Sequence, residues 1–169
     1  AVETTINVTI DPLTTPTFVQ IPAICLNAPA PALPLQSTND PTPITGTWSP
    51  ATIDTSVEGT FTFTFTPDAG QACTTTTTMD IVINSQITPV FTPIANICQN
   101  DTAPVLPSTS NAPESVPGTW SPATIDTSVA GTVTYTFTPD ATLAPCAVPV
   151  TMNITIDPTI TPTPNPTAD

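Results

Sequence analysis

The sequence predicts an all-β protein made of small β-sandwich domains in tandem, each closed by one disulfide and arranged in a line. Composition, an alternating pattern of apolar residues and an internal repeat support this prediction. The chain has 39 Thr and 24 Pro among its 169 residues. Because Pro interrupts helices and β-branched Thr favours strands, helices are disfavoured. Hydrophobic residues still make up 38% of the chain, which distinguishes it from a disordered acidic sequence.

An internal repeat of 72 or 73 residues organises the chain. Residues 46–57 read GTWSPATIDTSV, and residues 118–129 read the same twelve letters. We therefore assign a first repeat to residues 13–85 and a second repeat to residues 86–158.

The two flanks copy parts of the repeat. Residues 7–12 read NVTIDP and match NITIDP at residues 153–158, so residues 1–12 are expected to be the last strand of a preceding repeat. Residues 159–169 are expected to begin a following repeat or a linker, because their Ile-Thr-Pro copies residues 87–89. The pattern predicts a segment of a longer array. The alternative is a two-domain protein with frayed ends.

Period-two alternation predicts the principal strands. Residues 60–66 (TFTFTFT) and 132–138 (TVTYTFT) alternate large side chains with Thr, as a strand with one buried face should. Both end at Thr-Pro-Asp, which signals a turn. The same alternation predicts strands at 79–83, 152–156 and 6–10, and shorter strands are expected at 17–21, 45–48, 90–94 and 118–120.

The alternation and the twelve-residue segments also assign the core. Tryptophan beside a disulfide in a sandwich is usually buried, and the alternative is a Trp that stacks on sugars. Six aromatic side chains are expected in the core: Trp48, Phe63, Phe65, Trp120, Tyr135 and Phe137.

Each repeat holds two cysteines, Cys25 and Cys73 in the first and Cys98 and Cys146 in the second. A domain of this size has a thin core, so a covalent link is expected. Four cysteines allow three pairings, and the duplicated spacing favours Cys25 with Cys73 and Cys98 with Cys146. Each bridge would contribute on the order of 3 to 4 kcal/mol and would imply an oxidising compartment. Buried free thiols are the alternative, and zinc ligation is disfavoured.

The charge balance excludes most chemistry. The chain has 13 Asp plus Glu and no Lys, Arg or His, so its formal charge is −13. It lacks the usual groups for acid–base catalysis, Schiff-base formation and phosphate binding. We therefore expect no enzyme activity, no cofactor and no nucleic-acid partner, with a glycosidase using Asp54 or Asp126 as the one enzymatic alternative. No apolar run approaches 18 residues, so no membrane insertion is expected.

The sequence resembles the Ig-like tandem repeats of Bacteroidetes (flavobacterial) cell-surface adhesins. Three features carry the resemblance: GTWSPATIDTSV, the following Gly-Thr-x-Thr-aromatic-Thr-Phe-Thr-Pro-Asp, and the Ile-Cys and later Cys that bracket them. Both repeats are covered. The resemblance implies Ig-like domains, type IX secretion, display on the bacterial outer cell surface, and a part in adhesion or gliding motility. Relatives often have Gly after the first Cys, where this chain has Leu26 and Gln99.

Surface Thr residues offer two candidate sites. Thr62, Thr64, Thr134 and Thr136 are expected on exposed strand faces, where Thr serves β-propensity and solubility; the alternative is a hydroxyl array that binds glycan or ice. Thr102 lies in Asp101-Thr102-Ala103, which fits the O-glycosylation pattern of Bacteroidetes. Thr102 is therefore a candidate O-glycosylation site, and the protein a candidate glycoprotein.

Acidic loop residues offer a third candidate site. Asp54, Asp68, Asp126 and Asp140 follow or lie between predicted strands and are expected to make Asx-turns. The alternative is Ca²⁺ bound by clustered oxygen ligands at repeat junctions.

These observations predict a non-catalytic structural repeat module of a long extracellular or cell-surface filament. The expected partners are neighbouring repeats of the same chain, other copies in a fibre, and covalent glycans. The alternative is an adhesive module that binds glycans or surfaces through its Thr faces or Trp loops.

Overall fold

The structure is a computed structural model that describes residues 4–8, 10–71 and 73–162. Across these residues the chain forms eight β-strands and no helix, which confirms the all-β prediction. The chain divides between Ser85 and Gln86 into two compact units, and each unit has its own hydrophobic core.

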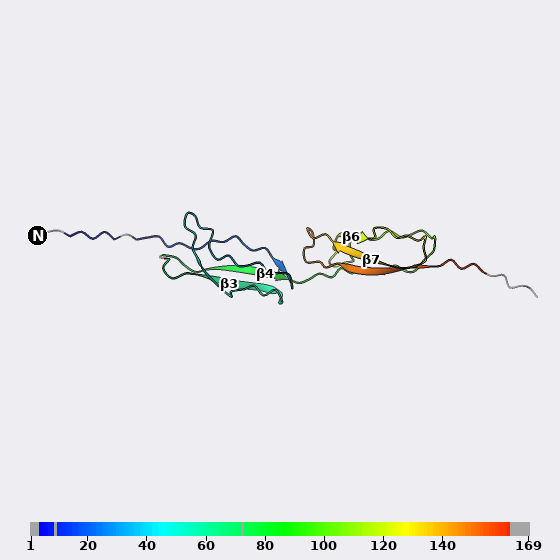
Figure 1. The fold of residues 1–169 in the computed structure, drawn as a ribbon, viewed down its shortest axis with the longest axis horizontal. Coiled ribbons are helices and arrows are strands. Elements are labelled where there is room, and N and C mark those ends of the chain that lie inside the picture. Colours follow the sequence, from blue (N-terminus) through cyan, green and yellow to red (C-terminus); the bar gives the residue numbers. More distant parts are fainter. Residues whose placement is uncertain (1–3, 9, 72, 163–169) are drawn as a thin grey trace, which may run out of the picture. The chain divides into compact units, whose positions relative to one another are not determined.

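The first unit contains one four-stranded sheet. The long hairpin of β3 and β4 is antiparallel and forms the centre, with β2 antiparallel to β3 and β1 parallel to β4 at the edges (Figure 1). The order across the sheet is β1-β4-β3-β2. The strands span β1 (Ile24–Cys25), β2 (Gly46–Ser49), β3 (Gly59–Pro67) and β4 (Thr77–Asn84).

The second unit repeats this sheet with the order β5-β8-β7-β6. The register is also repeated: Trp48 lies opposite Phe65 in the first unit, and Trp120 lies opposite Phe137 in the second. The repeated sequence therefore folds into the same unit twice. The strands span β5 (Ile97–Cys98), β6 (Gly118–Ser121), β7 (Gly131–Pro139) and β8 (Val150–Asp157).

Alternation places one face of each sheet in the core, as the period of two requires. In β3, Phe63 and Phe65 are buried, whereas Thr62 and Thr66 are exposed and Thr64 is half-buried. Gly46 of β2 lies directly under the Phe65 ring, since a Cβ built on this glycine would lie 2.6 Å from the ring. The identical GTWS segments thus combine a buried Trp with a glycine that admits a neighbouring aromatic ring.

Irregular segments cover the buried face of each sheet. In the first unit Leu33, Ile44 and Ile53 reach the core from outside the named strands, and only isolated bridges such as Gln36 with Thr45 order this layer. Proline removes a backbone donor and fixes φ, so the Pro-rich stretch 29–43 cannot form a continuous ladder. Among the described residues each unit therefore has a single sheet backed by an irregular layer, and the second sheet of a sandwich is not formed.

Two of the shorter predicted strands are absent from the described residues. Residues 17–21 and 90–94 form no strand, although Phe18 and Phe91 still pack against the two cores. Flanking prolines explain the difference, because Pro16 and Pro22 cannot donate to a ladder.

The predicted flanking strand is also not formed. Residues 4–8 and 10–12 are not in a strand, and Ile6, Val8 and Ile10 are 84%, 81% and 91% exposed. These side chains have a strand pattern but no sheet to cover them. Of the other predicted flank, residues 159–162 form no strand and residues 163–169 lie outside the described residues.

The cysteines do not pair inside each repeat, which corrects the expected pairing. Cys25 and Cys146 are disulfide-bonded, whereas Cys73 and Cys98 are free thiols. The sheet gives the reason: Cys25 lies opposite Asn84 at the end of β4, while Cys73 precedes the start of β4. The eight residues of β4 span about 25 Å, but the Cα atoms of a disulfide lie within about 7 Å. The second unit separates Cys98 from Cys146 along β8 in the same way.

Candidate functional site

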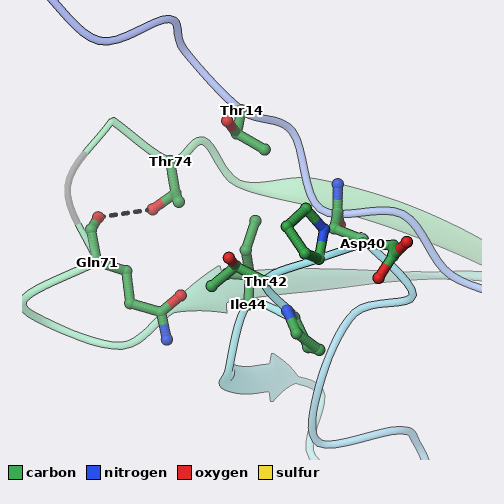
Figure 2. A pocket seen from close by; sticks show the side chains of 9 residues that line it. Thr14, Asp40, Thr42, Ile44, Gln71 and Thr74 are labelled. Atoms are coloured by element: carbon green, nitrogen blue, oxygen red, sulfur yellow. Dashed lines mark hydrogen bonds between the residues drawn. The ribbon is translucent and has the colours of Figure 1, made fainter.

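A cavity of about 470 Å³ opens at the end of the first unit where β4 begins. Figure 2 shows Gln71 and Thr74 on one side of it and Asp40 on the other, with Ile44 between them. The Thr74 hydroxyl donates a hydrogen bond to the Gln71 carbonyl oxygen at 2.9 Å. The Gln71 amide donates in turn to the Thr45 hydroxyl at 2.6 Å. The polar groups of this wall are therefore largely satisfied by one another.

Few reactive side chains line this cavity. Asp40 is the only ionisable group among its lining residues, and acid–base catalysis requires a second positioned group. The loop that forms it is not a feature of the repeat: Ser37 and Ile44 are seven residues apart, whereas the equivalent Ser110 and Val116 are six apart. A site that served every repeat would be expected in both loops.

The Thr faces form hydrogen bonds within their own sheets. The Thr62 hydroxyl donates to the Asp80 carboxylate at 2.6 Å, and the Thr134 hydroxyl donates to the Asn153 amide oxygen at 2.8 Å. Both pairs lie directly opposite each other on adjacent strands. These hydroxyls contribute to cross-strand pairing, which leaves fewer of them to bind an external surface.

The two tryptophans lie in the cores together with the other four aromatic residues expected there. The Trp48 indole packs against Phe18 and Phe65, with ring centroids 4.8 and 5.2 Å away. Its Nε1 donates to the Pro34 carbonyl oxygen at 2.7 Å. Trp120 repeats this arrangement with Phe91, Phe137 and the Pro107 carbonyl oxygen. Neither ring presents a face for sugar stacking.

The acidic loop residues act as local turn formers. The Asp54 carboxylate accepts a hydrogen bond from the Ser56 backbone amide at 2.9 Å, and Asp126 does the same with Ser128. The Ser56 hydroxyl and then the Ser56 amide hold the pKa of Asp54 below its ordinary value, and Ser128 lowers the pKa of Asp126 in the same way. These are the Asx-turns that the sequence predicts.

Two more acidic residues bind neighbouring hydroxyls. Asp140 accepts from the Thr142 hydroxyl at 2.6 Å and from the Thr142 amide at 2.9 Å, and these bonds lower the pKa of its carboxyl. Asp68 accepts from the Thr45 hydroxyl at 2.7 Å. The residues that the structure describes contain no group of three potential ligands placed to hold a metal ion.

Thr102 lies exposed in the loop after β5. The first unit has Pro29 at the equivalent position, so this candidate glycan site belongs to the second unit alone. Glycan attachment at Thr102 stays a prediction.

One pair of buried polar residues was not predicted. Ser37 and Ser110 are buried, and their hydroxyl oxygens accept hydrogen bonds from the backbone amides of Ile44 and Val116 at 2.9 Å in both units. Each bond fixes the loop that leads into the GTWS strand. The recurrence of Ser at equivalent positions of both repeats is the signal that would have found them.

Comparison with known proteins leaves the function open. No protein-family model matches the sequence, and no curated protein is significantly similar to it. Within the described part of the chain, no helix is long and apolar enough to cross a membrane.

Proposed function

We propose that this chain is a non-catalytic structural repeat module of a long extracellular or cell-surface filament, a stalk that serves adhesion or gliding motility. One observation carries the proposal: the chain builds the same four-stranded unit twice, with the same register and its own core each time. Units that each bury their own core can be multiplied along a chain without losing stability.

The proposal also includes an Ig-like fold for each unit. We take each unit as a reduced Ig-like sandwich in which the irregular layer containing Leu33, Ile44 and Ile53 stands where a second sheet would be. The units follow one another in tandem and in a line. Pro-rich junctions such as Leu13-Thr14-Thr15-Pro16 favour extended spacers between them.

The sheet geometry suits a chain under tension. The segment that leads into the first unit runs parallel to the strand that leaves it, since Thr14 pairs with Thr74 and Cys25 pairs with Asn84, both in parallel. Pulling the two ends of the unit apart therefore slides these neighbours along each other. Their hydrogen bonds are loaded together rather than one after another, which resists unfolding better than unzipping. The second unit repeats the geometry with Ile87 paired to Ala147 and β5 parallel to β8.

The leading flank supports a longer array. Val8 and Ile10 correspond to Ile81 and Ile83 in β4, which are buried at 0% and 2% exposure. In the flank the equivalent side chains are exposed. A preceding unit would supply the sheet that this segment lacks.

The surface suits a location outside the cell. The chain has thirteen carboxylates and no cationic side chain, so neighbouring copies repel one another, which favours solubility. At physiological salt this repulsion is screened beyond about 8 Å. The satisfied Thr hydroxyls and buried Trp rings favour a stalk over an adhesive module.

Immunogold labelling of intact cells tests the proposal, with antibodies raised against the 169-residue chain. We expect gold along filaments on unpermeabilised cells, and antibody preabsorbed with the chain should abolish it. Labelling only after permeabilisation would overturn an extracellular role. Binding of the purified chain to a glycan array would replace the stalk by the adhesive alternative.

A further inference from the structure

Three polar side chains of the first unit meet where β2 begins and β3 ends. The Thr45 hydroxyl donates a hydrogen bond to the Asp68 carboxylate at 2.7 Å. The same hydroxyl oxygen accepts a hydrogen bond from the side-chain amide of Gln71 at 2.6 Å. A hydroxyl held between a carboxylate and a carboxamide has the two partners that acyl transfer needs, a base and a carbonyl carbon.

The backbone holds these three residues in place. Thr45 directly precedes β2 and Asp68 directly follows β3, and the Asp68 amide donates to the Thr45 carbonyl oxygen at 2.9 Å. A turn brings Gln71 back toward them, and its backbone amide donates to the Asp68 carbonyl oxygen at 3.4 Å. Gly70 in this turn has a φ of 101°, a conformation that favours glycine. The Gln71 carbonyl oxygen is held in turn by the Thr74 hydroxyl (Figure 2).

The side-chain carbonyl carbon of Gln71, Cδ, lies within reach of the Thr45 hydroxyl oxygen. Cδ is bonded directly to Nε2, the atom that makes the 2.6 Å contact. The last torsion of a glutamine side chain is broad, so the amide plane can turn and present Cδ to the hydroxyl while the rest of the side chain stays in place. Acyl transfer starts from contacts of about 3–3.5 Å between the reacting atoms. One side-chain rotation therefore separates the observed hydrogen bond from an attack geometry.

Asp68 is placed to act as the general base. A carboxylate within hydrogen-bond distance of a hydroxyl can take its proton as the oxygen attacks. The chain has no Lys, Arg or His, so no cationic side chain competes with the Thr45 hydroxyl for this carboxylate.

We propose that the first unit forms an ester bond between the side chains of Thr45 and Gln71. The Asp68 carboxylate takes the hydroxyl proton, Oγ1 of Thr45 bonds to Cδ of Gln71, and the bond from Cδ to Nε2 breaks. Asp68 returns the proton to Nε2, which leaves as ammonia. The reaction is not a redox step and needs no co-reactant, and its net change is the loss of one ammonia molecule, about 17 Da.

The ester fastens a short edge strand. β2 has four residues and pairs with β3 alone among the named strands. A covalent link from the residue before β2 to the turn after β3 keeps this end of β2 from separating from its neighbour. The inference concerns the first unit alone and does not rest on the proposed function.

The second unit lacks the reacting groups and serves as an internal control. Pro117 stands in the place of Thr45, and Leu143 stands in the place of Gln71. Asp140 is retained, and its amide donates to the Pro117 carbonyl oxygen at 2.8 Å. This unit therefore has the carboxylate and the backbone pairing but neither the hydroxyl nor the carboxamide.

Mass spectrometry of the full chain, folded and then reduced, tests the proposal. We expect a mass about 17 Da below the sum of the residues. An endoproteinase that cleaves before Asp places Thr45 in peptide 40–53 and Gln71 in peptide 68–79. These peptides should stay joined until alkaline hydroxylamine cleaves the ester. Joined peptides in more than half of the chains would support the ester, and half or less would overturn it.

Four variants assign the roles, with Trp fluorescence to show that each keeps its fold. Thr45→Val and Asp68→Asn should both abolish the mass loss, whereas Thr45→Ser retains a hydroxyl and should retain the ester. Asp140→Asn, the matched change in the second unit, should leave the ester intact. A mass loss that persists in Thr45→Val would arise elsewhere in the chain and overturn the proposal. An ester that forms fully in Asp68→Asn would overturn the role of Asp68 as base.

Discussion

Replacing Phe65 by Ala is expected to unfold the first unit selectively. The Phe65 side chain is 0% exposed and packs against the rings of Phe18 and Trp48, whose centroids lie 4.7 and 5.2 Å away. Removing a buried Phe side chain costs about 3–5 kcal/mol through lost burial and the cavity left behind. A unit this small is expected to have a total stability of only about 5 kcal/mol, so the substitution removes most of it.

Urea unfolding followed by Trp fluorescence measures each unit separately, because the chain has two tryptophans, one per unit. Trp120→Phe leaves Trp48 to report on the first unit, and Trp48→Phe leaves Trp120 to report on the second. Reductant is present throughout so that no disulfide contributes to either midpoint. With a denaturant slope of about 1 kcal/mol per M, the Phe65→Ala midpoint reported by Trp48 should fall by about 3 M or more. The Trp120 midpoint should stay within about 0.5 M.

Two matched variants decide the interpretation. Phe137→Ala should reverse the pattern, because Phe137 is the buried equivalent in the second unit. Phe61→Ala, on the same face of β3 as Phe65 but 36% exposed, should cost less than Phe65→Ala because less of its side chain is buried. Equal shifts at both reporters would show one shared core, and a Phe65 effect no larger than the Phe61 effect would show that burial does not stabilise the unit.

Three further changes test local contacts. Gly46→Ala should lower the stability of the first unit by about 2 kcal/mol, because the new Cβ would collide with the backbone of β3; an unchanged melting temperature would contradict this close approach. Ser56→Ala should raise the pKa of Asp54 toward 3.8 in a carboxyl ¹³C NMR titration, because the Ser56 hydroxyl is the first cause of its lowering. A depressed folded-state pKa stabilises the protein above the unfolded-state value, so the difference between this variant and the wild type should vanish as the pH falls through the folded-state pKa. Trp48→Phe should cost about 1–3 kcal/mol by leaving the Pro34 carbonyl oxygen without its donor, and calorimetry showing no loss would mean that water replaces the indole.

The long strands were predictable because their signal is local. The alternation at 60–66 and 79–83 specifies both a strand and the face it buries, and β3 and β4 contain these residues with Phe63, Phe65 and Ile81 inward. The alternation over a few neighbouring residues is enough to predict which side chains of these strands are buried.

The irregular layer and the disulfide were not predictable in this way. Phe18 and Ile44 enter the core from Pro-interrupted segments whose path depends on contacts with distant strands. For the cysteines, a bridge within each repeat and a bridge between successive repeats have the same period of 73 residues. Sequence spacing therefore cannot distinguish the two pairings. The distinction comes from β4, which separates Cys73 from Cys25 along the sheet.

Placing Cys25 and Cys73 at opposite ends of β4 also makes a bond between them a marker of unfolding. The eight residues of β4 span about 25 Å, far beyond the roughly 7 Å between the Cα atoms of a disulfide. A chain in which Cys25 is joined to Cys73 must therefore have lost the pairing of β1 with β4.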